Sequence, residues 1–284
     1  MKTTKVISIL SILVLSFTSC SGSDDETSVT QNQNPTPTTP TPTNPGQSGT
    51  GKFTKNTLIE DYTGTWCGYC PRVTYAIEQL IAQNVTAIPV AIHINDTFTC
   101  SEANTFDTQF SNFVTGYPTG VLDRKEKWTS PQPANLNQVK NMTGVNADLG
   151  IAMKPTVSSG IINLDVKVKF DANMSNTKLV VYVLEEGLKF KQTNYTSYYG
   201  GTSEILNFKQ DHTLRAALTN VLGDNITGNT NDGSTYIRNF SKAVPSNITN
   251  TSNLSFVAFV LDSNGKVINT RSALLGENQN FQEH

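Results

Sequence analysis

Residues 57–73, TLIEDYTGTWCGYCPRV, decide the fold of the first half of the chain. Residues 58–62 favour a strand, and residues 63–66 favour a turn. A helix is predicted after Cys67, because apolar side chains recur there at helical spacing, at Val73, Ile77, Leu80 and Ile81. Pro71 fits the first turns of that helix, where backbone N–H groups have no helical partner. The segment therefore predicts a strand, a turn and a helix that begins beside two cysteines.

The next hundred or so residues continue this alternation of strands and helices. We expect a strand at 88–94, a helix at 102–114, a short strand at 120–123 and a helix at 134–147. Strands that alternate with helices are typical of α/β domains, and we place such a domain at residues 53–153.

The pattern changes near Pro155. Residues 161–170 alternate between apolar and polar side chains, as expected for a half-buried strand. Further strands are expected at 179–184, 256–261 and 266–269. We therefore predict an antiparallel β-sandwich over residues 154–284. Residues 190–235 show no regular pattern and predict a long insertion or long loops.

The N-terminus has the features of an export signal. Two lysines precede an apolar run that ends at Phe17 and is too short to span a bilayer as a helix. Small residues then precede Cys20, which resembles the lipobox of bacterial lipoproteins. This resemblance implies a signal peptide at residues 1–19 and a lipid on Cys20, with an ordinary cleavage site as the alternative. Residues 20–52, rich in Thr, Pro and Ser, predict a disordered linker from the lipid anchor.

The composition argues against one class of function. The 284 residues carry a formal net charge of -2, and only 15% of them are charged. The sequence has no basic stripe with interleaved aromatic residues, so nucleic-acid binding is not expected. A weakly charged chain rich in Asn, Thr and Ser suits an exported protein.

Cys67 and Cys70 are placed for thiol–disulfide exchange. A thiolate is the attacking species, yet an ordinary cysteine with a pKa of about 8.5 is only about 3% ionised at pH 7. A cysteine at the N-terminus of a helix faces unpaired N–H groups, which lower its pKa. Cys67 can therefore attack a substrate, and Cys70, one helical turn later, can resolve the mixed disulfide.

Three other interpretations of this pair stay open. The first is a purely structural disulfide, although a four-residue loop gains less stability from closure than a longer one. The second is a metal site completed by His93 and Cys100, which needs four converging ligands. The third is a scaffold whose cysteines no longer exchange disulfides. The strand before the pair and the helix after it favour the redox interpretation.

Residues 57–73 resemble the active-site segment of the thioredoxin superfamily, in which a tryptophan such as Trp66 commonly precedes the first cysteine. The resemblance implies a reversible disulfide between Cys67 and Cys70. It also implies that Asp61 is a buried acid that assists proton transfer, with a strand-end acid facing water as the alternative.

The same resemblance points to Tyr117-Pro118-Thr119 as the segment that contains the family's cis-proline. Pro118 is then expected beside Cys67, where it shapes the substrate groove. The residues expected to contact substrate are Trp66, Gly68, Tyr69 and Tyr117. Gly68-Tyr69 differs from the Gly-Pro dipeptide of reducing thioredoxins, so the pair does not define the direction of electron transfer.

The motif TGTWCGYCP is more narrowly similar to the outer-membrane-protein twenty-eight-type lipoprotein family of Gram-negative bacteria. The stretches 181–187, 211–215 and 256–260 strengthen this similarity. It implies a lipoprotein of the outer membrane, on its periplasmic or cell-surface side.

Together these features predict a cell-envelope thiol–disulfide oxidoreductase. Its expected partners are exported protein thiols or disulfides and, through the N-terminal lipid, the membrane. No metal or organic cofactor is expected. The alternative is a non-enzymatic, surface-exposed binding module, and a buried sulfur at Cys67 favours that alternative.

Other residues support weaker hypotheses. Cys100 is expected to be a buried small residue, with a third redox thiol or a regulatory partner as the alternatives. His93 and the pair Asp211-His212 are expected to have structural roles. The aromatic stretch 195–199 is interpreted either as core packing or as a flexible loop that grips peptide or glycan.

Overall fold

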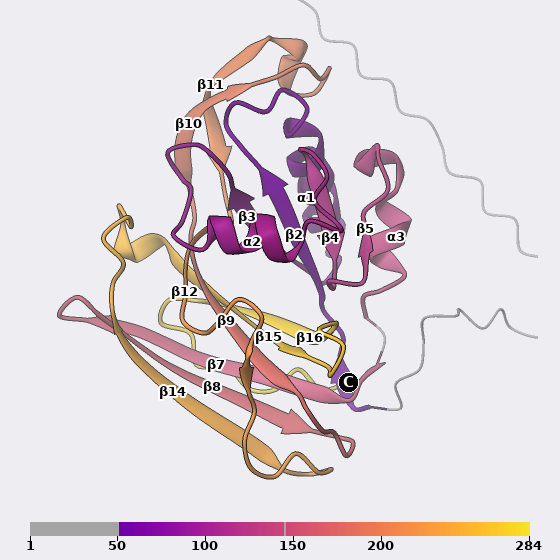
Figure 1. The fold of residues 1–284 in the computed structure, drawn as a ribbon, viewed down its shortest axis with the longest axis vertical. Helices are drawn as coiled ribbons and strands as arrows, with labels where there is room; N and C mark the ends of the chain where they lie inside the picture. The colour runs from indigo at the N-terminus through magenta and orange to yellow at the C-terminus, as the bar shows by residue number, and fades with distance from the viewer. Residues whose placement is uncertain (1–50, 145) are drawn as a thin grey trace, which may run out of the picture. The chain divides into compact units, whose positions relative to one another are not determined.

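The computed structural model describes residues 51–144 and 146–284 (Figure 1). The predicted signal peptide, the lipidation site Cys20 and the linker up to residue 50 lie outside these residues. Within the part of the chain that is described, no helix is both long and apolar enough to cross a membrane.

The first half of the chain contains a β–α–β unit. β2 (Thr57–Thr63) is fully buried, α1 (Pro71–Ala82) follows the cysteine loop, and β3 (Ala87–His93) pairs with β2 in parallel. β4 (Thr119–Leu122) pairs antiparallel with the other edge of β2 and is followed by β5 (Glu126–Lys127). These elements confirm the predicted strands and the predicted first helix.

Two further helices are shorter than expected. α2 spans Ala103–Gln109 within the predicted range 102–114. α3 spans Leu136–Lys140 within the predicted range 134–147 and follows the 3-10 turn η1 (Gln132–Ala134). The end of the second range instead contains Gly144, whose φ of +71° departs from the helix, and then β6 (Asn146–Ala147), which pairs with β1 (Phe53–Thr54).

The second half of the chain is almost entirely β. A three-stranded antiparallel sheet has the order β14-β8-β7, with bounds Thr235–Ala243, Ile161–Phe170 and Leu149–Ser158. β9 (Lys178–Glu185), β15 (Leu254–Leu261) and β16 (Val267–Leu274) form a second antiparallel set, and the 3-10 turn η3 (Thr251–Asn253) precedes β15. β8 matches its predicted range, because its alternate side chains point into the core.

The predicted fold class, an α/β domain followed by an antiparallel β-sandwich, is wrong. Of the described residues, 42% lie in strands and only 14% in helices. Strands of both halves belong to one nine-stranded sheet of order β16-β15-β9-β12-β3-β2-β4-β5, and β13 (Asp224–Asn225) pairs with β9 beside this path. The expected boundary between residues 153 and 154 falls within β7.

The two halves are joined by β12 (Thr213–Ala217). It pairs antiparallel with β9 and, through Thr213 and Ala91, in parallel with β3. This five-residue strand lies in the stretch 190–235, where no pattern was visible. The sequence could not reveal the connection, because the pairing depends on chain segments more than a hundred residues apart.

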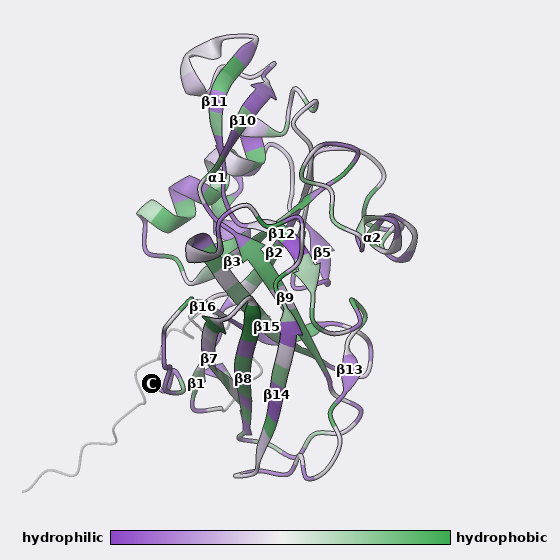
Figure 2. Cartoon of the chain, turned by 90° about the vertical axis from the view of Figure 1, so that its left-hand side faces the viewer, coloured by the Kyte–Doolittle hydropathy of each residue, from purple (hydrophilic) through white to green (hydrophobic). Residues whose placement is uncertain are grey.

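Three apolar clusters hold the layers together. One cluster lies between the three-stranded sheet and the side of β9 and β15 that faces it. A second cluster lies on the opposite side of β9 and β15 and also includes side chains of β2, β3 and α2. The third lies between β2, β4, α1 and α3. Figure 2 shows that β3 and β15 are predominantly hydrophobic. Such strands are expected where both faces of a sheet are covered.

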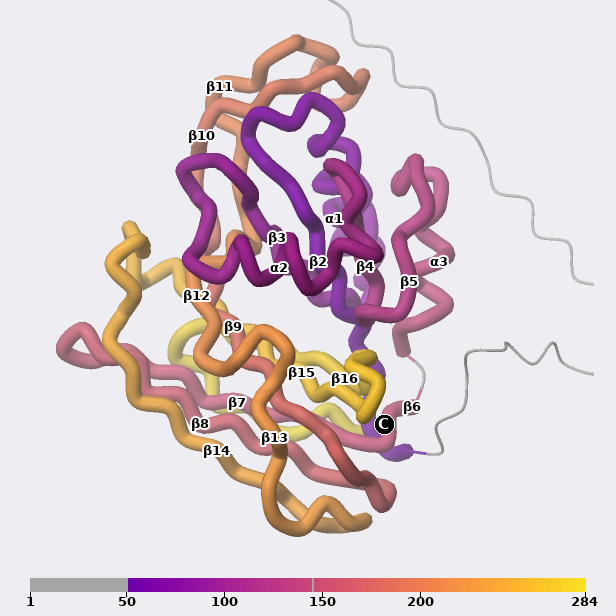
Figure 3. Tube along the Cα trace, in the orientation of Figure 1, coloured from indigo at the N-terminus to yellow at the C-terminus, as the bar shows by residue number. Residues whose placement is uncertain are grey.

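A long hairpin leaves the large sheet. β10 (Leu188–Thr193) follows β9, β11 (Glu204–Gln210) leads into β12, and the two strands pair antiparallel. The tip contains the 3-10 turn η2 (Tyr199–Gly201). Figure 3 shows the hairpin beside the loop that precedes α1. Within the stretch 190–235, where a long insertion or long loops were predicted, the chain thus contains these strands, with turns and loops between them.

Candidate functional site

Cys67 and Cys70 form a disulfide at the beginning of α1, as predicted. The Cys67 N–H donates to the carbonyl oxygen of Gly64 (3.0 Å), and the Cys70 N–H donates to that of Cys67 (3.3 Å). Cys70 is the N-cap residue and Pro71 begins the helix. The pair therefore lies at the positive end of the α1 helix dipole, where a thiolate is stabilised.

Both cysteines are buried in this disulfide form, with 5% of Cys67 and 1% of Cys70 exposed. The neighbouring aromatic side chains are open to solvent, since Trp66 is 47% and Tyr69 54% exposed. Trp66 donates from Nε1 to the carbonyl oxygen of Ile94 (2.9 Å). Its ring meets that of Tyr117 edge-on, with centroids 5.6 Å apart. We call Trp66, Tyr69, Tyr117 and Tyr195 the aromatic rim.

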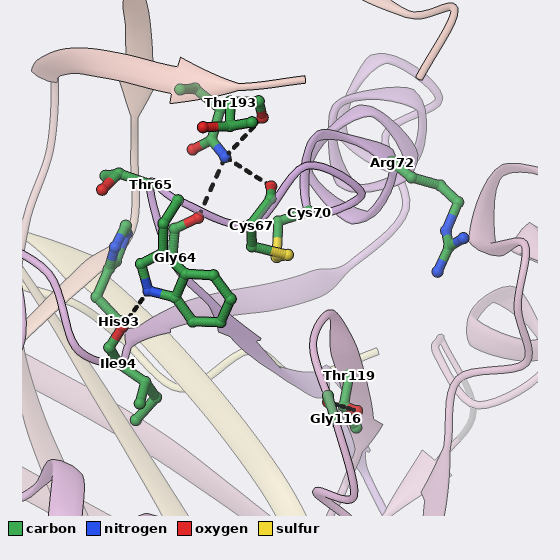
Figure 4. The surroundings of a disulfide bond; sticks show 12 residues. Gly64, Thr65, Cys67, Cys70, Arg72, His93, Ile94, Gly116, Thr119 and Thr193 are labelled. Atoms are coloured by element: carbon green, nitrogen blue, oxygen red, sulfur yellow. Dashed lines mark hydrogen bonds between the residues drawn. A yellow bond between two sulfur atoms is a disulfide. The ribbon is translucent and has the colours of Figure 1, made fainter. Parts of the chain in front are cut away.

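The peptide bond between Tyr117 and Pro118 is cis, and β4 begins directly after it. Thr119 closes this turn by donating from Oγ1 to the carbonyl oxygen of Gly116 (2.6 Å). In Figure 4 the turn marked by Gly116 and Thr119 lies on the side toward which the disulfide sulfurs point. The role of Tyr117 and Pro118 in substrate binding stays a prediction.

Asp61 lies near the end of β2 and is only 2% exposed. Within the described part of the chain, its Oδ1 atom has no hydrogen-bond partner. Burial raises the pKa of its carboxyl from 3.8 to about 8. The side chain lines a cavity of about 70 Å³ together with Thr74 and Glu78 of α1 and Lys209 and Gln210 of β11. Asp61 is thus a buried acid, and the water-facing alternative does not apply.

The end of the hairpin packs directly on the cysteine loop. The Thr193 N–H donates to the carbonyl oxygen of Thr65 (2.9 Å), and the Tyr195 N–H donates to that of Gly68 (2.7 Å). Gly68 permits this approach, because a Cβ atom there would lie 2.2 Å from the Tyr195 ring. The ring of Tyr195 also meets that of Tyr69 edge-on, with centroids 5.7 Å apart.

Gln192 of β10 makes further bonds to this loop. Its Nε2 donates to the carbonyl oxygens of Gly64 (3.1 Å), Cys67 (3.0 Å) and Thr193 (3.1 Å), which Figure 4 marks with dashed lines. Gln210 donates from Nε2 to the Oε1 atom of Gln192 (3.0 Å). The role of Gln192 is not visible in the sequence, because an isolated glutamine in a polar stretch carries no signal of its partners.

The aromatic stretch at the hairpin tip packs on the outside of α1. The rings of Tyr75 and Tyr198 are stacked with centroids 4.3 Å apart, and Tyr199 donates from its hydroxyl to Glu78 Oε2 (2.8 Å). Most of the stretch 195–199 is therefore used for packing, whereas Tyr195 is 65% exposed.

Asp96 supports the cysteine loop from the other side. It accepts hydrogen bonds from the N–H groups of Thr65 (2.8 Å) and Phe98 (2.8 Å), and His93 Nδ1 lies 2.7 Å from its Oδ2. Burial alone would raise the pKa of the Asp96 carboxyl, but the bonds from His93, Thr65 and Phe98 outweigh it and lower this pKa. His93 therefore has the structural role that was expected.

Cys100 is a free thiol buried in the apolar cluster around Phe106. Burial raises its pKa to about 12, so a thiolate is strongly disfavoured there. Among residues 51–144 and 146–284, no group of three or more His, Cys, Asp or Glu side chains is arranged to hold a metal ion.

Asp211 and His212 face different partners. Asp211 accepts from the N–H of Gly187 (2.7 Å) and pairs with Lys209, while His212 pairs with Glu186 through Nδ1 (3.2 Å). Burial opposes ionisation of Glu186, but its bonds to His212 and Ser255 lower its pKa to about 2. These contacts fix the junction between the hairpin and the sheet.

Comparison with protein families identifies the group to which this chain is related. The sequence profile of the family described as outer membrane protein Omp28 matches residues 103–279, which is more than half of the chain. The chain belongs to the Omp28 family. This confirms the narrower of the two resemblances and the link to outer membrane proteins, whereas the wider resemblance to the thioredoxin superfamily is not shown. The match begins after Cys70, so Omp28 membership alone assigns no role to the cysteine pair.

Solved structures resemble this Omp28 protein as well. HBP35 of Porphyromonas gingivalis has 22% identity, a TM-score of 0.65, and a match over 81% of this chain and 78% of its own. A crystal structure of an Agrobacterium tumefaciens protein has 12% identity and a TM-score of 0.48, over 80% of this chain and 97% of its own. The likeness to HBP35 shows a shared fold and nothing further. No curated protein sequence matches the chain significantly.

Proposed function

We propose that this Omp28-family protein is a cell-envelope thiol–disulfide oxidoreductase that acts on exported protein thiols or disulfides. The observation that carries the proposal is the Cys67–Cys70 disulfide at the first turn of α1, within the aromatic rim. A disulfide in this position has a pre-formed environment for the thiolate that appears when it is reduced.

The chemistry follows from the arrangement of the two sulfurs. In the dithiol form the Cys67 thiolate attacks a substrate disulfide, forms a mixed disulfide, and releases one substrate thiol, which takes up a proton. Cys70 then loses its proton and attacks Cys67 Sγ, which re-forms the Cys67–Cys70 bond and releases the second substrate thiol. The protein dithiol is oxidised and the substrate disulfide is reduced; the reverse sequence oxidises a substrate dithiol.

Asp61 supplies a group that can exchange protons in this cycle. Its pKa of about 8 lies close to neutral pH, which suits general acid–base catalysis. The cavity beside Asp61 contains polar groups from α1 and β11, which can hold water and pass protons. Asp61 thus assists the deprotonation of Cys70, and Pro118 with the aromatic rim holds the substrate.

A second candidate function is a non-enzymatic binding module. The low exposure of Cys67 favours it, because a reachable sulfur is needed for attack. In this interpretation the disulfide only holds the loop in shape, and the exposed rings of Trp66, Tyr69 and Tyr195 bind the partner.

We also propose that the protein is held at the outer membrane by a lipid on Cys20, on the periplasmic or the cell-surface side. The apolar run that ends at Phe17 and the small residues before Cys20 support this proposal. Replacement Cys20→Ala is expected to abolish incorporation of labelled fatty acid and to release the protein from the membrane fraction. Retention of the label by the variant would contradict it.

The reduction potential of the pair tests the two functions against each other. The full-length protein in detergent is equilibrated with glutathione buffers, and the dithiol fraction is measured by alkylation and mass spectrometry. A reversible potential between about -120 and -270 mV, with turnover of a model protein disulfide, is expected. A potential below about -300 mV without turnover would support the binding module. The variant Cys100→Ala removes the remaining buried thiol from the mass analysis.

A further inference from the structure

The β10–β11 hairpin supplies hydrogen-bond donors to the backbone carbonyl groups of the cysteine loop. It donates to four carbonyl groups of this loop: Thr193 and Tyr195 donate from the backbone to Thr65 and Gly68, and Gln192 donates from its side chain to Gly64 and Cys67. The donors lie more than a hundred residues from their acceptors in sequence. The conformation of the loop around Cys67 is therefore set by the hairpin as well as by α1.

The orientation of Gln192 is itself fixed. Its side chain is buried, with 2% of the residue exposed, and its Oε1 atom accepts a bond from Gln210 Nε2 (3.0 Å). Since the Oε1 atom is engaged by a donor, the Nε2 group faces the carbonyl oxygens of Gly64, Cys67 and Thr193, which share its two hydrogens. Gln210 is buried as well and lines the cavity that contains Asp61.

The bond to the carbonyl oxygen of Cys67 bears on the chemistry of that residue. A carbonyl oxygen carries partial negative charge, which opposes a thiolate on the same residue. A buried amide donor offsets this charge, and such interactions are strong where water is excluded. The disulfide carries no charge and gains less from the donor. The amide of Gln192 therefore favours the reduced form of the pair over the disulfide.

We propose that Gln192 is a positioning residue of the redox pair: from the hairpin, it holds the carbonyl groups of Gly64 and Cys67 and shifts the equilibrium of the pair toward the dithiol. This inference rests on the proposed exchange function and adds a tuning element that lies outside the cysteine motif. Gln210 acts behind it by keeping the amide in the required orientation.

The test compares variants of the full-length protein in glutathione buffers, in which the disulfide and two glutathiones exchange with the dithiol and glutathione disulfide. Gln192→Met keeps the length of the side chain and removes the donor. We expect its equilibrium to move toward the disulfide by about tenfold, which is about 30 mV for this two-electron couple.

Lys191→Met is the matched control. Lys191 neighbours Gln192 on β10, is exposed, and pairs with Glu204 rather than with the loop. Its equilibrium is expected to equal that of the wild type. A Gln192→Met protein that is folded and has the wild-type equilibrium, or a shift toward the dithiol, would overturn the proposal.

The wild-type chain gives a second measurement if the variants at position 192 do not fold. The side-chain amide hydrogens of Gln192 are expected to exchange with solvent at least about 100-fold more slowly than those of exposed glutamines, because they are buried and bonded. Exchange at the rate of exposed glutamines would overturn the proposal. A wild-type pair that is inert toward substrates refutes the proposed function, whereas an active pair unaffected by Gln192 refutes only the positioning role.

Discussion

Replacement of Asp61 by asparagine is expected to stabilise the fold, and increasingly so as the pH rises. Asp61 has a pKa of about 8 in the folded protein, against 3.8 for an ordinary aspartate. The folded state therefore holds a proton that the unfolded chain has already released at neutral pH. The contribution of Asp61 to the stability of the wild type is fully present below pH 3.8 and is lost as the pH rises toward 8. Asparagine has nearly the same shape and does not titrate.

The size of the effect follows from the two pKa values. A pH of 7 lies about 3.2 units above the pKa of Asp61 in the unfolded chain. At 1.36 kcal/mol per unit, keeping Asp61 protonated at this pH costs the folded state about 4 kcal/mol. At about pH 4.5 the same relation gives about 1 kcal/mol. Asp61→Asn should therefore raise the free energy of unfolding by about 4 kcal/mol at pH 7 and by about 1 kcal/mol at pH 4.5. The expected difference between the two pH values is about 3 kcal/mol.

Urea unfolding at a series of pH values measures this difference directly. Glu126→Gln, at an exposed position of β5, serves as the control and should show no comparable pH dependence. If the gain from Asp61→Asn were the same at pH 4.5 and pH 7, Asp61 would titrate as an ordinary aspartate in the fold, and its proposed role in proton transfer would lose its basis.

Three other substitutions test the site and its support. Cys70→Ser leaves the first cysteine without a resolving partner, so a mixed disulfide with substrate protein should accumulate on non-reducing gels; its absence in the presence of substrate would argue against exchange. Gly68→Ala places a methyl group against the ring of Tyr195 and is expected to cost about 1–3 kcal/mol in the free energy of unfolding. That cost should shrink in a Tyr195→Ala background, and an equal cost in both backgrounds would disprove the contact. Arg124→Leu removes the charged partner of the buried Glu60 carboxylate, which lies 2.7 Å from Arg124 Nη2, and is expected to lower the free energy of unfolding by about 3–5 kcal/mol; a loss below about 1 kcal/mol in chemical unfolding would show that this ion pair does not stabilise the fold.

The local elements of this chain follow from its sequence. The spacing of Val73, Ile77 and Leu80 predicts α1, because a helix that packs on a sheet must place apolar side chains on one face. The alternation in residues 161–170 predicts β8 for the corresponding reason. The position of Cys67 and Cys70 at the helix start also follows, since the flanking elements are local, whereas their disulfide was implied by the resemblance of residues 57–73 to a known active-site segment.

The tertiary structure alone decides how these elements combine. β12 joins the two halves into one sheet through a single parallel pairing to β3, and nothing in a five-residue segment encodes which strand it will meet. Gln192 reaches the cysteine loop only because β10 and β11 extend β9 and β12 beyond the sheet. Periodicity reports which face of an element is buried, whereas the partner on that face is chosen by the packing of the whole chain.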